Sequence, residues 1–222
     1  MFWQKPKKTM AEFKKLERPQ ILKRGRTLIL DDEEPEILEP LKQEGLTIDH
    51  IAETTDPRFV FLEQGEYDVL LLDYGDVGKS FGQQQGLDVL IHLRRIIPTL
   101  RIVAFTGRTF DASQADFFRL CDDVLRKDAG IRESMEIIEN QLEQALTPEI
   151  FWKAILDSLE IPLELSVKNK LEKEIIAAAE EKTEKRERVL KNIYKMMGIS
   201  GSLILEKLID KLVTVILPEF LK

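Results

Sequence analysis

Alternating strand-like and helix-like segments between residues 27 and 146 constrain this chain more than any other feature of its sequence. The expected strands are at 27–30, 47–52, 69–72, 101–105 and 123–125. The expected helices are at 35–44, 57–64, 87–95, 112–120 and 131–146. Nearly continuous apolar runs such as VLLL are typical of parallel strands that helices cover on both faces. The pattern predicts a doubly wound α/β domain built on a parallel sheet.

Charge divides the chain into three segments. Residues 1–26 carry nine Lys and Arg against two acidic residues, whereas residues 27–148 carry 11 basic and 25 acidic residues. Residues 149–222 carry 13 of each kind. We therefore expect a basic N-terminal tail (1–25), an α/β domain (26–146) and an all-α C-terminal extension (147–222). The acidic middle makes nucleic acid an unlikely direct ligand, because phosphate backbones select for Lys and Arg.

The two flanking segments are expected to be helical. In the tail, a capping box at residues 9–12 predicts a short helix at 10–18 that Pro19 ends. Beyond Pro148, the pattern predicts helices at 148–160, 167–197 and 203–217. Three helices make a thin core, so we expect a helical hairpin that completes its burial in a homodimer or against a partner protein.

The tail mixes aromatic and aliphatic residues with lysines, which permits a weak contact with an anionic membrane surface. Packing on the acidic domain and disorder are the alternatives. The single cysteine fits a reducing compartment. No apolar run approaches the ~20 residues that span a bilayer, and the N-terminus lacks the features of a signal peptide. A cytoplasmic location is expected.

The stretch VLLLDYGDVGKS (69–80) permits two interpretations. Gly-Lys-Ser after a strand suggests a phosphate-binding P-loop, but that motif requires glycine where this chain has Asp73. It also requires a helix that opens at the Lys-Ser pair, whereas FGQQQG follows here and indicates a loop. The second interpretation, in which Asp73 itself accepts a phosphoryl group, is favoured.

Polar residues at the other strand ends support the second interpretation. Ligands of open α/β sheets bind beyond the carboxyl ends of the strands. Carboxylates that converge there suit a hard divalent cation such as Mg²⁺, which would keep Asp73 ionised as a nucleophile. Thr106 offers a hydroxyl to a phosphoryl oxygen, Gly107 leaves the approach open, and Lys127 supplies a point charge. In chain order these ends carry Asp31 and Asp32, Asp73, Thr106 and Lys127.

The motifs LILDDE, VLLLDYG, IVAFTG and DDVLRKDAG resemble the signature positions of the response-regulator receiver domain, across about residues 26–146. The resemblance implies a flavodoxin-like fold with a five-stranded sheet and Mg²⁺-dependent phosphorylation by a histidine kinase or phosphotransfer protein. It assigns the phosphoacceptor role to Asp73 and the sensing of the phosphoryl group to Thr106 and Lys127. The metal ligands that it implies are Asp31, Asp32, Asp73 and the Gly75 carbonyl.

This chain departs from the family pattern at several positions. Val124 stands where the family usually has an aromatic switch residue, and Asp128 replaces a common proline. The loop at 75–86 is longer than usual and contains Lys79. Gly75 offers no side chain to orient a hydrolytic water, so we expect a long-lived phosphoryl state.

The sequence therefore predicts a phosphorylation-controlled signalling switch whose C-terminal helices act through protein–protein contacts or dimerisation. It predicts no catalysis beyond self-phosphorylation and self-dephosphorylation at Asp73. One alternative is a DNA-binding transcriptional regulator, although residues 149–222 show no helix-turn-helix signature and no excess of basic residues. The other is a Mg²⁺-dependent phosphohydrolase that uses the same carboxylates with Asp76 as a second acid, although nothing indicates a substrate cap.

Overall fold

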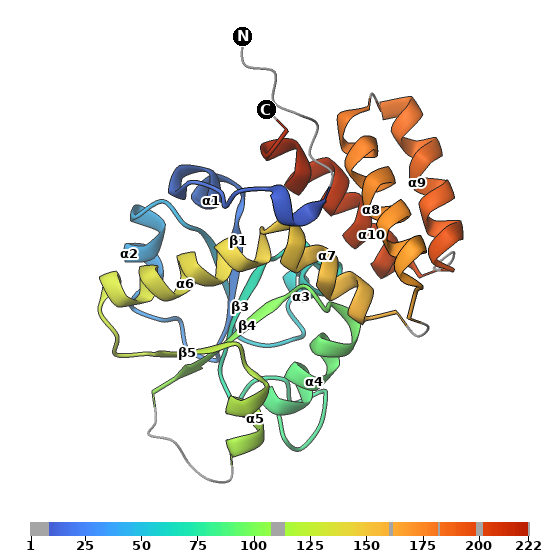
Figure 1. Cartoon of the computed structure of the whole chain (residues 1–222). Coiled ribbons are helices and arrows are strands. Elements are labelled where there is room, and N and C mark those ends of the chain that lie inside the picture. The colour runs from blue at the N-terminus through green and yellow to red at the C-terminus, as the bar shows by residue number, and fades with distance from the viewer. Residues whose placement is uncertain (1–8, 108–113, 160–161, 182, 199–201, 222) are drawn as a thin grey trace. The chain divides into compact units, whose positions relative to one another are not determined.

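The structure, a computed structural model, describes residues 9–107, 114–159, 162–181, 183–198 and 202–221. Within Glu17–Ala145, five parallel strands form one sheet in the order β2-β1-β3-β4-β5 (Figure 1). This is the strand order of flavodoxin-like doubly wound sheets, so the predicted α/β fold is confirmed. The strands are β1 (Arg26–Leu30), β2 (Thr47–Ile51), β3 (Val69–Leu72), β4 (Arg101–Thr106) and β5 (Asp123–Arg126).

The register of the two central strands sets the level of the residues that follow them. Leu30 of β1 is paired with Leu72 of β3, and both leucines are fully buried. The N–H of Asp73 donates to the Leu30 carbonyl at 3.0 Å, which continues the ladder one residue further. Asp31 and Asp73 therefore leave the sheet at the same level and on neighbouring strands.

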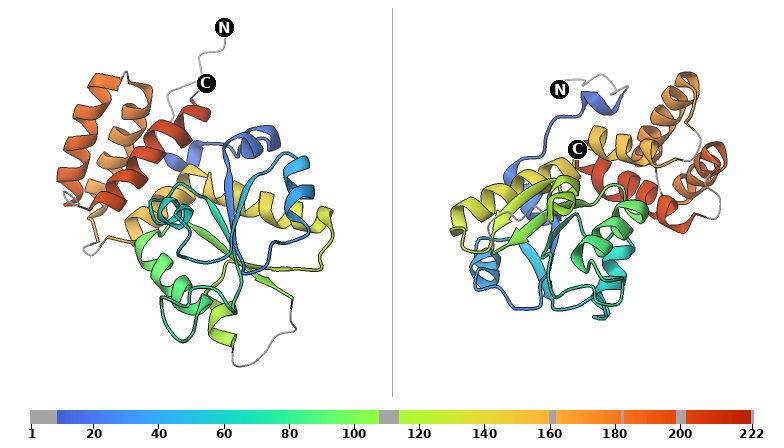
Figure 2. Two further views of the ribbon diagram at one scale, coloured as in Figure 1. Left: turned by 180° about the vertical axis from the view of Figure 1, so that it is seen from behind. Right: turned by 90° about the horizontal axis from the view of Figure 1, so that it is seen from below.

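Helices cover both faces of the sheet, as Figure 2 shows. The longest of them, α6, crosses β3, β4 and β5, and it also packs against α1 and α2. The sequence pattern predicts one buried stripe on α6 from Ile131, Met135, Ile138 and Leu142. The last three are buried, but Ile131, the first residue of the helix, is 44% exposed. Residues 112 and 113 of the predicted fourth helix lie outside the described residues. The helices are α1 (Arg18–Arg24), α2 (Leu38–Gln43), α3 (Arg58–Glu63), α4 (Gly86–Ile96), α5 (Ala115–Leu120) and α6 (Ile131–Ala145).

A second compact unit combines the two ends of the chain, Met1–Leu16 and Leu146–Lys222. Within it, α8 packs against α9, while α7 packs against η1, α10 and η3. Its elements are η1 (Met10–Glu12), α7 (Pro148–Asp157), α8 (Leu165–Glu180), α9 (Thr183–Met197), α10 (Leu203–Lys211), the π-helix η3 (Leu212–Ile216) and η4 (Leu217–Glu219). We call this part the helical unit, and we call Glu17–Ala145 the α/β unit.

The prediction of one continuous helix at 167–197 is wrong. The backbone of Glu181 is extended, with φ −86° and ψ 157°, and it ends α8. The Arg186 side chain then donates to the carbonyls of Ala178 and Glu181, which caps the end of α8. Folding back lets buried residues of both helices, such as Ile175 and Ile193, share one core. Burial outweighs the helix propensity of the charged run between them.

The prediction of a helix at 10–18 that Pro19 ends is also wrong. Only Met10–Glu12 forms a helical turn, and Pro19 instead lies in the first turn of α1. A proline fits there because the first N–H groups of a helix have no partner within the helix. The apolar residues of the segment, Met10, Phe13 and Leu16, are buried at 1%, 8% and 9% exposure.

These three side chains belong to the helical unit and are not exposed to a membrane surface. The Met10 N–H donates to Glu172 of α8 at 2.5 Å, and the Phe13 ring lies edge-on to Phe220 with centroids 5.6 Å apart. Residues 1–8, which carry the rest of the predicted membrane contact, lie outside the described residues. Across the described parts of the chain, every helix is too short or too polar to span a membrane.

Candidate functional site

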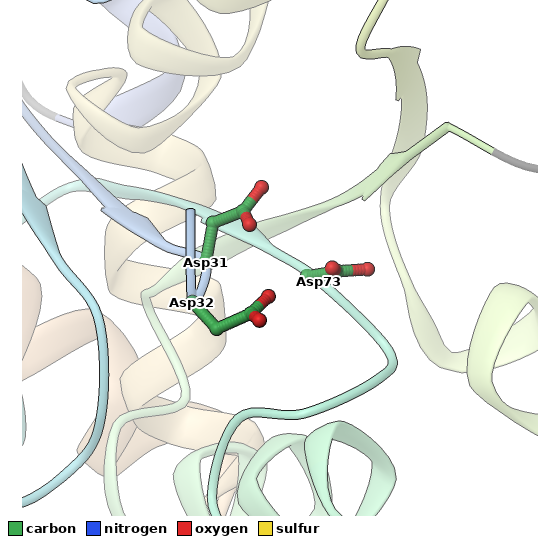
Figure 3. A group of neighbouring side chains, drawn as sticks. All are labelled: Asp31, Asp32 and Asp73. Atoms are coloured by element: carbon green, nitrogen blue, oxygen red, sulfur yellow. The ribbon is translucent and has the colours of Figure 1, made fainter. Parts of the chain in front are cut away.

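Three carboxylates meet at the carboxyl edge of the sheet. Asp31 and Asp32 follow β1 directly, and Asp73 follows β3. One carboxylate oxygen from each lies within 4.8 Å of the other two, and Figure 3 shows the three side chains beside one another beyond the ends of β1 and β3. Asp31 is buried, Asp73 is half-buried and Asp32 is exposed. The structure thus brings together the three side chains that the sequence analysis selected as metal ligands.

Lys127, which follows β5, forms ion pairs with two of these carboxylates. Its Nζ lies 2.6 Å from Asp31 Oδ2 and 2.9 Å from Asp73 Oδ2. Its backbone N–H donates to the Thr106 carbonyl at 2.9 Å, which ties the residue to the end of β4. The second oxygen of Asp73, Oδ1, accepts the N–H of Tyr74 at 2.7 Å. Lys127 therefore already contacts the carboxylate that we expect to accept a phosphoryl group.

The other predicted site residues lie at the same edge. Thr106 ends β4 and is 8% exposed, and Gly107 follows it at the surface. A Cβ built on Gly107 would lie 3.6 Å from Lys127 Cδ, so Gly107 sits beside the stem of the lysine. A Cβ built on Gly75 would meet no atom within 4 Å, so that position faces open space. The role of the Gly75 carbonyl as a metal ligand stays a prediction.

Burial and charge act in opposite directions on Asp73 and Lys127. Burial raises the pKa of Asp73, and the charge of Asp31 adds to the increase. The hydrogen bond and charge of Lys127 oppose it without cancelling it. Burial by itself lowers the pKa of Lys127, but the hydrogen bonds to Asp31 and Asp73 outweigh it, and the net shift is upward. The fold therefore favours the protonated form of Lys127, and it makes Asp73 harder to ionise than an exposed carboxyl.

The donor set fits a hard divalent cation. Lys127 supplies one positive charge to a cluster of three carboxylates, which leaves an excess of negative charge at the site. All three ligands are oxygens, and the count is small, as Mg²⁺ prefers when it keeps part of its water shell. A cation held by Asp31, Asp32 and Asp73 would favour the ionised form of Asp73.

The Gly-Lys-Ser sequence is not a phosphate-binding loop in this structure. The N–H of Gly78 donates to Glu53 Oε1 at 2.7 Å, and that of Lys79 points to Glu53 Oε2 at 3.4 Å. An internal carboxylate therefore takes the backbone donors that a phosphate would need. In addition, α4 begins only at Gly86, so it does not open at the Lys-Ser pair as a P-loop requires.

The loop at 75–86 is anchored rather than open. Gly78 has φ +72°, and a Cβ there would lie 2.2 Å from Val89 Cγ2, so only glycine fits. At the end of the loop, the Gly86 N–H donates to the Tyr74 carbonyl at 3.1 Å. Lys79 lies 3.5 Å from Asp76 and both side chains are largely exposed. Val124, at the usual position of the aromatic switch residue, is 42% exposed on β5.

Two residues near the site have contacts that the sequence analysis did not foresee. His50 Nε2 lies 2.7 Å from the Asp31 carbonyl, so this nitrogen carries the proton and donates it. Glu53 accepts hydrogen bonds from Thr54 as well as from the 75–86 loop. Both lie at or just beyond the carboxyl end of β2. The strand-end rule that selected the other site residues would have found Glu53, had it been applied to β2.

No protein-family model matches the sequence, and no curated protein matches it. Among solved structures, the chain is similar to a CheY-like response regulator receiver domain protein from Methanospirillum hungatei JF-1. The identity is 21% and the TM-score 0.45, with 55% of this chain and 95% of that chain covered. It is also similar to a response regulator from Thermotoga maritima, at 11% identity and a TM-score of 0.43, covering 53% of this chain and 97% of that one.

NtrX from Brucella abortus, in complex with ATP, matches at 17% identity and a TM-score of 0.47, over 78% of this chain. This chain spans 40% of the length of that NtrX structure. The α/β unit has the flavodoxin-like fold of response-regulator receiver domains, with a helical unit attached.

Proposed function

We propose that this protein is a phosphorylation-controlled signalling switch whose α/β unit accepts a phosphoryl group on Asp73. The observation that carries the proposal is the cluster of Asp31, Asp32 and Asp73 with Lys127 Nζ at 2.9 Å from the Asp73 carboxylate. An isolated carboxylate is a weak nucleophile for phosphorus, because it repels the negatively charged donor. This cluster combines a carboxylate with positive charge at the point of attack.

The chemistry is a phosphoryl transfer from a phosphohistidine of a histidine kinase or phosphotransfer protein. An Asp73 oxygen attacks phosphorus, the P–N bond of the donor breaks, and the electron pair returns to the imidazole. Mg²⁺ bound by the three carboxylates would supply charge neutralisation at the phosphoryl oxygens. Lys127 pairs with the acyl phosphate once it has formed, and the Thr106 hydroxyl donates to one of its oxygens.

The helical unit is the proposed output, through dimerisation or through binding of a partner protein. Its exposed apolar side chains, Ile150 at 40%, Leu165 at 73% and Leu203 at 65%, are available for such contacts. A DNA-binding output is less well supported, because residues 149–222 carry equal numbers of acidic and basic residues. The histidine kinase or phosphotransfer protein that donates the phosphoryl group is likewise a proposed partner.

Intact-mass measurement after incubation with acetyl phosphate and Mg²⁺ tests the proposal. We expect one added phosphoryl group per chain, which Asp73→Asn abolishes. Asp76→Asn is the matched control, since it removes an exposed acid of the neighbouring loop and should leave the adduct unchanged. Absence of an adduct on the unaltered chain refutes the switch. Continued release of inorganic phosphate over many turnovers instead supports the phosphohydrolase.

The lifetime of the adduct is a second readout. Because Gly75 offers no side chain to hold a hydrolytic water near Asp73, we expect the acyl phosphate to persist after the phosphodonor is removed. A time course of intact mass measures this. Rapid loss of the phosphoryl group from the purified protein contradicts the expectation without affecting the assignment of Asp73.

A further inference from the structure

The α/β unit is an insertion in the helical unit. The chain leaves the helical unit between Leu16 and Glu17 and returns to it between Ala145 and Leu146. Residues before and after the insertion share one core, as the Phe13–Phe220 ring contact and the Met10–Glu172 hydrogen bond show. The α/β unit is therefore connected to the helical unit by two covalent links instead of one.

Each link begins at a residue of the carboxylate site. On the N-terminal side, α1 leads through Gly25 directly into β1, which ends at Leu30, immediately before Asp31. On the C-terminal side, Lys127 is separated from α6 only by Asp128, Ala129 and Gly130. The Lys127–Asp31 ion pair, at 2.6 Å, joins these two starting points.

The two links are also joined near their far ends. The Arg18 side chain at the start of α1 donates to both carboxylate oxygens of Glu139 on α6, at 2.8 to 3.0 Å. A Cβ on Gly25 would lie 2.7 Å from Leu142 Cδ2, so α1 and α6 approach as closely as a glycine allows. The two links are thus joined at the site by the Lys127–Asp31 pair and a second time by the contacts between α1 and α6.

We propose that phosphorylation of Asp73 controls the helical unit through both links at once, by changing how α1 and α6 are held together. This inference rests on the proposed function. A phosphoryl group on Asp73 adds nearly two negative charges next to Lys127 Nζ, and it competes with Asp31 for the lysine. A weaker Lys127–Asp31 ion pair no longer holds the starting points of the two links together. The change passes through β1 and α1 on one side and through α6 on the other.

This arrangement provides a route of output that needs no aromatic switch residue. Val124, at that position, is an exposed aliphatic side chain and has no ring to rotate. The coupling between site and helical unit then depends on the integrity of the two links. Switches of this kind typically shift an equilibrium by about 5- to 150-fold.

Trp152, on α7 and 5% exposed, is a built-in reporter of the helical unit. The chain has two tryptophans, so Trp3→Phe leaves Trp152 as the single fluorophore. In this background, we expect acetyl phosphate with Mg²⁺ to change the Trp152 emission, and Asp73→Asn to abolish the change. The phosphoryl group on Asp73 is quantified by intact mass in the same samples.

Two kinds of variant test the links. A Gly-Ser-Gly-Ser insertion between Leu16 and Glu17 lengthens one link and leaves Met10, Phe13 and Leu16 in place. It should remove most of the emission change while phosphorylation proceeds. Arg18→Glu and Glu139→Arg should each reduce the change, and the double exchange should restore it. Recovery in the double exchange shows that the effect comes from the ion pair and not from either residue alone.

The outcomes separate the two proposals. If no phosphoryl group is gained, the proposed function fails. If the phosphoryl group is gained and the emission change is the same in the insertion variant and both charge variants as in the Trp3→Phe background, the two-link inference is refuted and the proposed function stands.

Discussion

Replacing Gly86 with alanine tests how closely the phosphoacceptor strand depends on the first turn of α4. A Cβ at Gly86 would lie 2.3 Å from the Asp73 carbonyl oxygen and 2.8 Å from the Tyr74 carbonyl oxygen. These are backbone atoms, so relief requires a shift of about 1 Å in either the end of β3 or α4. Overpacking of this kind typically costs about 1–3 kcal/mol. For a chain of this length, that lowers Tm by roughly 2–4 °C for each kcal/mol.

Gly86→Ala should also slow phosphorylation, because the displaced backbone carries Asp73 itself. Gly75→Ala is the matched control: its Cβ meets nothing within 4 Å, and the change should stay within about 0.5 kcal/mol. Thermal unfolding followed by circular dichroism gives the stability, and intact mass after acetyl phosphate gives the rate. Equal Tm values and equal rates for the two variants would show that the reasoning about this contact is wrong.

Three further predictions concern the surroundings of the site. Because the pKa of Asp73 in the fold lies above its ordinary value, its ionisation destabilises the metal-free protein. Asp73→Asn should therefore unfold at higher urea concentration than the unaltered chain at neutral pH, and the difference should vanish as the pH falls below about 3.9; a constant difference would contradict this. Glu53→Gln should speed amide exchange at Gly78 and Lys79 in mass-spectrometric measurements, since ionised Glu53 accepts both N–H groups. Unchanged exchange would contradict the anchoring of the 75–86 loop by Glu53. His50→Phe removes a donor to the Asp31 carbonyl and should weaken Mg²⁺ binding in calorimetry by about 2- to 12-fold, as expected for one hydrogen bond. His92→Phe is the control, because His92 pairs with Glu63 on α3. Equal losses of Mg²⁺ affinity in both variants would refute the idea that His50 positions Asp31.

The α/β unit was open to prediction from sequence because its signals are local and its topology is restrictive. The strands β1, β3 and β4 are short apolar runs, and parallel strands with helical crossovers place all carboxyl ends at one edge. Selecting polar residues at those ends was enough to identify Asp31, Asp32, Asp73 and Lys127 as neighbours. Their contacts required the structure, since nothing local shows that Lys127 reaches Asp31 as well as Asp73.

The helical unit was harder to predict because its decisive contacts are distant in sequence. Residues 180–182 are Glu, Glu and Lys, which are good helix formers, so propensity favours a continuous helix at the point where α8 in fact ends. Pro19 fits both the end and the first turn of a helix, and only packing decides between them. Nothing in the sequence around Phe13 or around Phe220 indicates that the two rings are in contact. The basic composition of the N-terminal segment is typical of an exposed tail, and it gives no sign that the apolar residues at 10–16 are buried.

The insertion of one unit in the other sets an order for folding during synthesis. The α/β unit is complete once residue 145 has left the ribosome, whereas Phe13 must wait for Phe220. After residue 145, the 75 residues up to Phe220 take roughly 4–15 s at about 5–20 residues per second. Throughout that time Met10, Phe13 and Leu16 are exposed on a nascent chain whose receiver-like part is already folded. The apolar side chains of this segment thus stay exposed to solvent until the last helices form, and any variant that slows those helices lengthens the exposure.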